Sequence, residues 1–151
     1  MRLPTRLPIE RIEDYHTHYL GRTAEGHLFW GYETFVFIKP YSDIEQGDDW
    51  RKWRKEYVVL HKFDSEGNYL STRYCSSLTS ESSEQELSGE LAKMVAELGD
   101  FEFHDIEIKL FQTKIDNITF GLIVDEVSGT INLQPSSTIS FQEPWDGGYY
   151  T

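Results

Sequence analysis

The sequence predicts an α+β fold, with one bent, mainly antiparallel sheet of about seven to eight strands and one main amphipathic helix at about residues 83–98. Three observations predict it. Most apolar residues lie in short runs rich in aromatic and β-branched side chains, these runs are separated by short turn sequences, and only one segment has helical spacing. Short turns join antiparallel neighbours, whereas parallel strands need long crossovers. A chain of 151 residues fits one domain.

The first 14 residues are predicted to be an extended arm, and residues 15–151 to be the domain itself. Pro4 and Pro8 lie in the arm and favour extended backbone. The arm has no apolar run typical of a secretory signal, and no window of the chain is apolar enough to span a membrane. We therefore expect a cytoplasmic protein without a membrane partner.

The first predicted hairpin occupies residues 17–38 and turns at Gly26, which adopts a positive φ at low cost. Pro40 ends its second strand, because proline cannot donate to a β-ladder. A second hairpin joins residues 56–63 to residues 69–74 through the turn sequence DSEGN.

The helix begins with a capping box, in which Ser83 is followed three residues later by Glu86. Its apolar residues recur at helical spacing, and Gly99 is placed to end it. These residues are Leu87, Leu91, Met94, Val95 and Leu98. Strands are then predicted within residues 101–115, 118–124, 131–133 and 138–141.

The composition excludes several classes of function. The 14 basic and 26 acidic residues give a net charge of −12, which disfavours nucleic-acid binding because that binding depends on phosphate contacts. The single cysteine excludes an intrachain disulfide framework. No glycine-rich phosphate loop or multi-cysteine metal site is present, so no cofactor is expected.

Two thirds of the net charge lies within residues 81–107, where nine acidic residues accompany one lysine. A field of one sign speeds association with a partner of the opposite sign. We expect the acidic helix residues to lie opposite the apolar face and to bind a basic protein partner. The alternative is a solvated surface that maintains solubility. The predicted binding residues are Glu86, Glu90, Glu97 and Asp100, with Trp145 as a further anchor.

The C-terminal tail, PWDGGYYT at residues 144–151, combines large aromatic side chains with two glycines. It has two interpretations. Either it docks back on the domain and covers a sheet edge, which we favour because free aromatic side chains reduce solubility, or its Trp and Tyr residues anchor a partner.

Histidine and cysteine residues suggest two other chemistries. His16 and His18, two apart on a strand, would point to one face and bind a metal together with His27. The alternative is two solvent-facing histidines, which we favour. Cys75 would act as a nucleophile if His61 activates it across the second hairpin, and is otherwise a small core residue.

The run WRKWRK at residues 50–55 is the main basic cluster. Cations interleaved with indole rings bind phosphates and stack on bases. Acidic residues flank the run, however, at Asp48, Asp49 and Glu56. We therefore favour a loop that packs its tryptophans and solvates its cations.

Three segments together resemble a group of small acidic bacterial proteins of unknown function: YLGRTAEG at residues 19–26, FDSEGN at residues 63–68, and the tail at residues 144–151. The resemblance covers most of the chain after residue 15 and implies no catalytic residue. In general character the chain is also similar to immunity proteins that neutralise toxins. A self-associating adaptor, which forms a homo-oligomer through sheet edges and aromatic residues, is the second hypothesis. A metal-binding domain or enzyme that uses His16 and His18 is the third.

Overall fold

The computed structural model describes residues 1–14, 16–136 and 139–151. Over these ranges the fold is α+β, as predicted, with one α-helix and eleven strands in three antiparallel sheets. The predicted domain boundary at residue 15 and the first residue of the predicted strand 138–141 lie outside the described residues. None of the described helices is long and apolar enough to cross a membrane.

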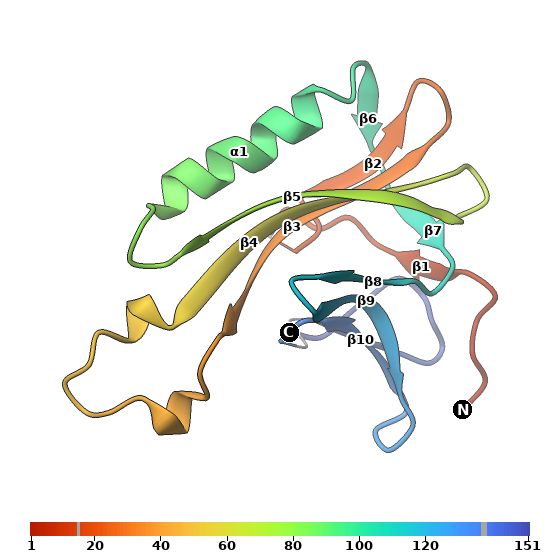
Figure 1. Cartoon of the computed structure of the whole chain (residues 1–151). Coiled ribbons are helices and arrows are strands. Elements are labelled where there is room, and N and C mark those ends of the chain that lie inside the picture. Colours follow the sequence, from red (N-terminus) through yellow and green to blue (C-terminus); the bar gives the residue numbers. More distant parts are fainter. Residues whose placement is uncertain (15, 137–138) are drawn as a thin grey trace.

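A five-stranded sheet with the order β5-β4-β3-β2-β6 forms the centre of the molecule (Figure 1). The two predicted hairpins are present as the pairs β2–β3 and β4–β5. Their turns contain Gly26 and Gly67, which have φ angles of 89° and 86°. The strands are β2 (Tyr19–Thr23), β3 (Leu28–Phe37), β4 (Arg54–Phe63), β5 (Tyr69–Leu78) and β6 (Phe101–Phe103).

The helix α1 (Glu84–Ala96) covers one face of this sheet (Figure 1). The Ser83 hydroxyl accepts a hydrogen bond from the Glu86 N–H at 3.1 Å, which confirms the predicted cap. A Cβ atom added at Gly31 would lie 3.1 Å from the Leu91 side chain, so the helix packs closely on β3. The buried cluster between helix and sheet contains Phe29, Val58, Leu60, Leu87, Leu91, Met94 and Val95.

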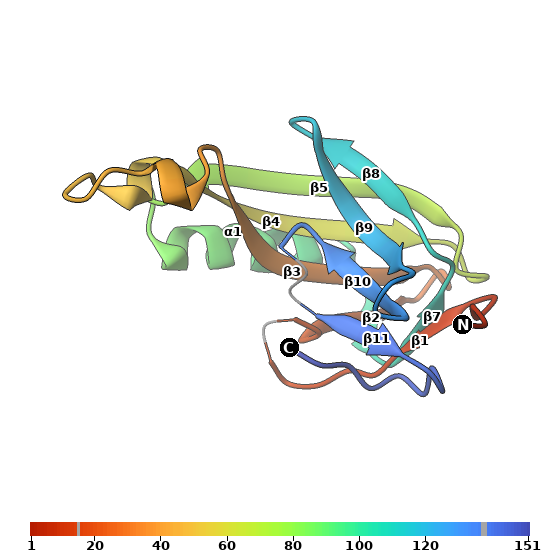
Figure 2. The ribbon, with the colours of Figure 1, turned by 90° about the horizontal axis from the view of Figure 1, so that it is seen from below.

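The other face of the central sheet packs against two smaller sheets (Figure 2). One has four strands in the order β11-β10-β9-β8, and the other pairs β1 with β7. The division into three sheets was not predicted; the sequence suggested one bent sheet with fewer strands. The strands are β1 (Leu7–Ile9), β7 (Ile106–Ile108), β8 (Gln112–Ile115), β9 (Ile118–Asp125), β10 (Thr130–Gln134) and β11 (Ser140–Gln142).

The N-terminal arm contributes to the core through β1. Leu7 and Ile9 are buried and lie opposite Ile108 and Ile106 of β7. Pro8 between them points the other way, as expected for a proline in a short edge strand. The arm is therefore extended, and its alternating apolar residues complete the core below the central sheet.

The C-terminal tail docks back on the domain. Tyr150 and Ser140 exchange two backbone hydrogen bonds of 2.9 Å, so the tail covers the outer edge of β11. The Trp145 indole N–H donates to the Arg2 carbonyl at 2.8 Å, and Glu10 N–H donates to the Gly147 carbonyl at 2.9 Å. Both chain ends are thereby fixed to one another.

Tyr149→Phe is expected to destabilise the protein by about 1–3 kcal/mol. Its hydroxyl lies 2.7 Å from the Thr17 hydroxyl and donates to the Asp14 carboxylate at 3.0 Å, and all three groups are partly buried. Tyr150→Phe is the control, because that hydroxyl has only a 3.4 Å contact with Gln142 and is exposed. Urea denaturation compares the two; equal losses would show that the tail is not held by this cluster.

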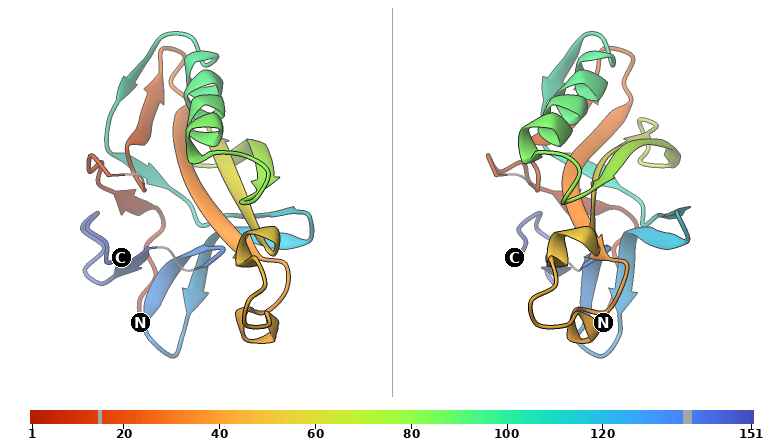
Figure 3. Two further views of the ribbon diagram at one scale, coloured as in Figure 1. Left: turned by 90° about the vertical axis from the view of Figure 1, so that its left-hand side faces the viewer. Right: turned by 60° about the vertical axis from the view of Figure 1, so that its left-hand side comes forward.

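The hairpin between β3 and β4 projects beyond the body of the molecule (Figure 3). It contains two short 3₁₀ helices, η1 (Tyr41–Asp43) and η2 (Trp50–Lys52). The predicted basic cluster is located here, and three of its four cations form salt bridges: Arg51 with Asp49 at 2.9 Å, Arg54 with Glu56 at 3.1 Å, and Lys55 with Asp116 at 2.9 Å. Arg54 lies over the Phe35 ring. The pairing leaves little free positive charge for phosphate binding.

Candidate functional site

The predicted acidic residues of α1 form one exposed stripe. Glu86, Glu90 and Glu97 are exposed, and at about 100° per residue they lie within roughly 40° of each other around the helix. Arg73 of β5 forms a salt bridge with Glu97 at 2.7 Å, so the stripe lies on the flank of α1 above β5. The prediction that these residues lie directly opposite the apolar face of α1 is therefore wrong, because they lie on its flank. We call these three residues the acidic stripe.

Asp100 extends the negative charge beyond the C-terminal end of the helix. Its side chain is exposed, and its backbone carbonyl accepts a hydrogen bond from the Ala24 N–H at 2.9 Å. This bond ties the turn after α1 to the turn of the β2–β3 hairpin. The neighbouring Glu102 carboxylate is paired with Arg22 at 2.6 Å. Asp100 is therefore held beside the β2–β3 turn, towards the edge of the central sheet that lies opposite β5.

The opposite flank of α1 carries a second acidic group that was not predicted. Glu33 of β3 is half-buried beneath the helix, and Ser88 of α1 donates a hydrogen bond to it at 3.0 Å. Burial raises the pKa of Glu33, and the nearby charges of Glu84 and Glu56 raise it further. The sequence did contain a signal for this group, because Glu33 is a carboxylate in the middle of a strand rich in aromatic residues.

Trp145 does not join the acidic residues. It packs with the core on the other face of the central sheet, next to the N-terminal arm. The structure thus aligns Glu86, Glu90 and Glu97 on one flank of α1, ties Asp100 to the turn of the β2–β3 hairpin, and places the tryptophan elsewhere, in the docked tail.

His16 and His18 lie in a turn before β2 rather than on a strand, so the predicted shared face is wrong. His16 is buried against Tyr149, with its Nδ1 atom 3.6 Å from the Asp14 carboxylate. The His18 ring packs instead on Tyr19 and Phe103. Within the described ranges, no group of three or more His, Cys, Asp and Glu side chains is arranged to hold a metal.

Cys75 and His61 lie on opposite faces of the central sheet. Cys75 is opposite Val58 and packs towards α1, whereas His61 is opposite Thr72 and packs towards the smaller sheets. The hypothesis of a cysteine nucleophile activated by His61 is therefore wrong, and the alternative of a core cysteine fits its position.

His61 is the centre of a buried polar network instead. Its Nε2 atom lies 2.9 Å from the Tyr32 hydroxyl and its Nδ1 atom lies 2.7 Å from the Thr72 hydroxyl. The Thr72 hydroxyl in turn lies 2.7 Å from the Tyr69 hydroxyl. Burial lowers the pKa of His61 to about 3, so the ring is neutral at neutral pH. This network satisfies buried polar groups, and the His61 ring at its centre is completely buried.

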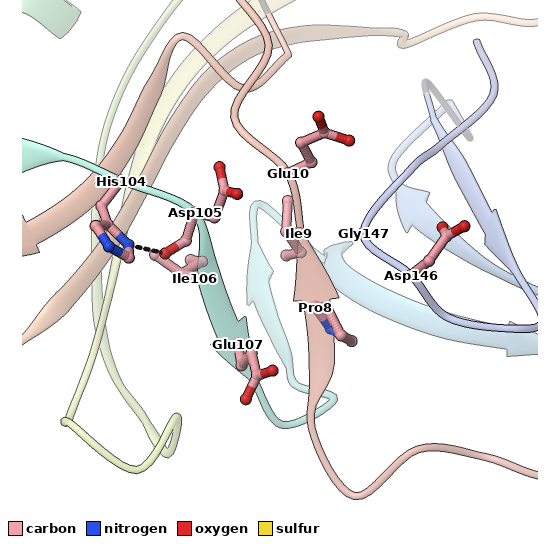
Figure 4. A pocket seen from close by; sticks show the side chains of 9 residues that line it. All are labelled: Pro8, Ile9, Glu10, His104, Asp105, Ile106, Glu107, Asp146 and Gly147. Atoms are coloured by element: carbon pink, nitrogen blue, oxygen red, sulfur yellow. Dashed lines mark hydrogen bonds between the residues drawn. The ribbon is translucent and has the colours of Figure 1, made fainter.

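A hollow of about 550 Å³ lies beside β1 and β7 (Figure 4). Acidic side chains line it, but two of them have partners: Glu107 pairs with Arg6 at 3.4 Å, and Asp105 accepts a hydrogen bond from the Arg11 backbone N–H at 2.8 Å. Glu10 and Asp146 complete the acidic lining. Its charge is thus partly compensated within the molecule, in contrast to Glu86 and Glu90.

Comparisons of the chain with family models, curated proteins and solved structures give no match. The function must therefore be argued from the surface itself, and the acidic stripe is an exposed, negatively charged part of it.

Proposed function

We propose that the protein is a cytoplasmic, non-enzymatic binding protein that presents the acidic stripe of α1 to a basic protein partner. The observation that carries this proposal is the alignment of Glu86, Glu90 and Glu97 on one exposed flank of a well-packed helix. A toxin neutralised by an immunity-like protein is one such partner.

Two features support the proposal. The stripe is rigid, because α1 is capped at Ser83 and its apolar face is buried on the central sheet. Its charge is also only partly compensated: Lys93 and Arg73 are the basic side chains on this flank, and Arg73 forms its salt bridge with Glu97 rather than with Glu86 or Glu90. A rigid field of one sign steers a basic partner and contributes to specificity.

The test is affinity capture from the native organism, read by mass spectrometry, with the full chain as bait at about 0.05 M and about 0.3 M salt. We expect one basic protein at low salt and much less at higher salt. Glu86→Gln with Glu90→Gln should reduce the capture, whereas the matched control Glu45→Gln with Glu126→Gln should not. An empty capture at low salt, or one insensitive to the stripe, would contradict the proposal.

A further inference from the structure

Strand β5 forms an open edge of the central sheet. It is the last strand in the order β5-β4-β3-β2-β6 and is ten residues long. Among the described residues, no other strand pairs with its outer side, and the one backbone hydrogen bond there is from Glu81 N–H to the Leu78 carbonyl at 2.9 Å. An edge of this kind is a template for pairing with another chain.

The register shows which backbone groups of β5 point outwards. Thr79 N–H donates to the Arg54 carbonyl of β4 at 2.9 Å, and the register between β4 and β5 is uniform from Lys55 to Lys62. Because bonded and non-bonded pairs alternate in an antiparallel ladder, the odd-numbered residues of β5 bond to β4. The N–H and C=O groups of Thr72, Tyr74 and Ser76 therefore face the open side.

The usual protections of an edge strand are missing from β5. It contains no proline and no lysine, and its one charged residue, Arg73, is neutralised by Glu97. Elsewhere the molecule does protect an edge: the tail, through Tyr150, pairs with Ser140 and covers β11. Among the described strands, the longest one at a sheet edge thus has no such cover.

The acidic stripe runs alongside this edge. The helix returns over β5 in the opposite direction (Figure 1), and Glu97 is fixed above Arg73. From Glu97 back to Glu86 the helix rises about 16 Å, which equals roughly five residues of a strand. The stripe therefore lies above β5 from Arg73 towards its C-terminal end.

The two faces beside the edge differ in character. On the face of α1, an added strand would meet the carboxylates of the acidic stripe. On the opposite face it would meet Tyr74, whose side chain is 48 % exposed and lies near Tyr57 of the core. A second copy of the chain, paired through its own β5, would bring two acidic stripes together, and the like charges would repel.

We propose that β5 accepts an antiparallel sixth strand from the basic partner, a segment in which basic side chains alternate with apolar ones. This inference rests on the proposed function and adds to it the mode of binding. The basic side chains point towards Glu86 and Glu90, the apolar ones lie beside Tyr74, and main-chain hydrogen bonds form with Thr72, Tyr74 and Ser76.

The probe is a synthetic peptide of alternating lysine and valine, as long as β5 and capped at both ends. A peptide of the same composition with its lysines and valines in two blocks is the control. Isothermal calorimetry at low salt should show tighter binding of the alternating peptide.

Variants of the protein test the role of the stripe in this binding. Glu86→Gln with Glu90→Gln should weaken the affinity for the alternating peptide roughly threefold to thirtyfold, as expected for the loss of two exposed ion pairs. Glu45→Gln with Glu126→Gln should leave that affinity unchanged.

Backbone methylation of the peptide tests the strand pairing without altering the protein. In the proposed register the valine N–H groups face β5 and the lysine N–H groups face away. Methylation of the valine nitrogens should abolish binding, whereas methylation of the lysine nitrogens should largely preserve it. Ser76→Pro gives the reciprocal test, because it removes an outward N–H that β4 does not use.

Amide hydrogen exchange identifies the residues of β5 to which the peptide binds. In the free protein, Thr72, Tyr74 and Ser76 should exchange faster than Arg73 and Cys75, and the alternating peptide should slow the exchange of the first three. The same affinity for both peptides, or for both methylated forms, would overturn strand addition while leaving the charge-based proposed function standing. A dimer of the free protein that Ser76→Pro dissociates would show that a second copy occupies the edge and would also overturn the inference.

Discussion

Acidification from about pH 6.5 to about pH 4 is expected to destabilise the protein by about 1.4 kcal/mol per pH unit through His61 alone. Burial lowers the pKa of His61 to about 3 in the folded protein, against 6.5 for a solvent-exposed histidine. Between these values the unfolded chain binds a proton that the folded chain excludes. The contribution of neutral His61 to the free energy of unfolding is therefore fully present above pH 6.5 and is lost as the pH falls towards 3.

The cause is the environment of the ring. His61 is completely buried, the centroid of its ring lies 4.8 Å from that of the Phe111 ring in a T-shaped arrangement, and both ring nitrogens contact neutral hydroxyls. Nothing in this network compensates a positive charge, and Tyr32, one of the two hydroxyl groups, is itself held neutral because burial raises its pKa.

The measurement is the free energy of unfolding in urea across this pH range for the wild type and His61→Gln. The variant should be less stable at pH 7 but should lose less stability on acidification, so that the two curves converge. His104→Gln, which changes an exposed histidine, is the control. Parallel curves for His61→Gln would contradict the buried neutral state.

Leu91→Ala is expected to cost about 2–5 kcal/mol of stability. Leu91 is 2 % exposed and lies at the centre of the cluster between α1 and the central sheet. The space it leaves faces Gly31, which has no side chain to fill it. Leu91→Met, which conserves volume, should cost less than about 1.5 kcal/mol. A loss below about 0.5 kcal/mol for Leu91→Ala would mean that the helix is not anchored as described.

The helix and the two hairpins were predictable because their signals are local. Ser83 and Glu86 mark the start of α1, and Gly26 and Gly67 occupy turns with positive φ. The division into three sheets was not predictable in the same way. Leu7 of β1 pairs with Ile108 of β7, about one hundred residues away, and nothing in either short strand specifies that partner.

The residues of the candidate site were predictable from the sequence, but their position on the molecule was not. Charge counting identified Glu86, Glu90 and Glu97, but their position above β5 depends on how α1 packs and on the Arg73 salt bridge. The Cys75 and His61 hypothesis failed because it required the register of the β4–β5 hairpin. That register changes between Lys62 and Phe63, next to the turn, and places the two side chains on opposite faces.

The most direct test of the central claim is amide hydrogen exchange on the protein bound to the basic partner recovered by capture. We expect slower exchange at Thr72, Tyr74 and Ser76, with no change at the projecting hairpin of residues 38–53. Protection confined to that hairpin, or to the hollow beside β1 and β7, would contradict the claim that the partner binds at the acidic stripe and the β5 edge.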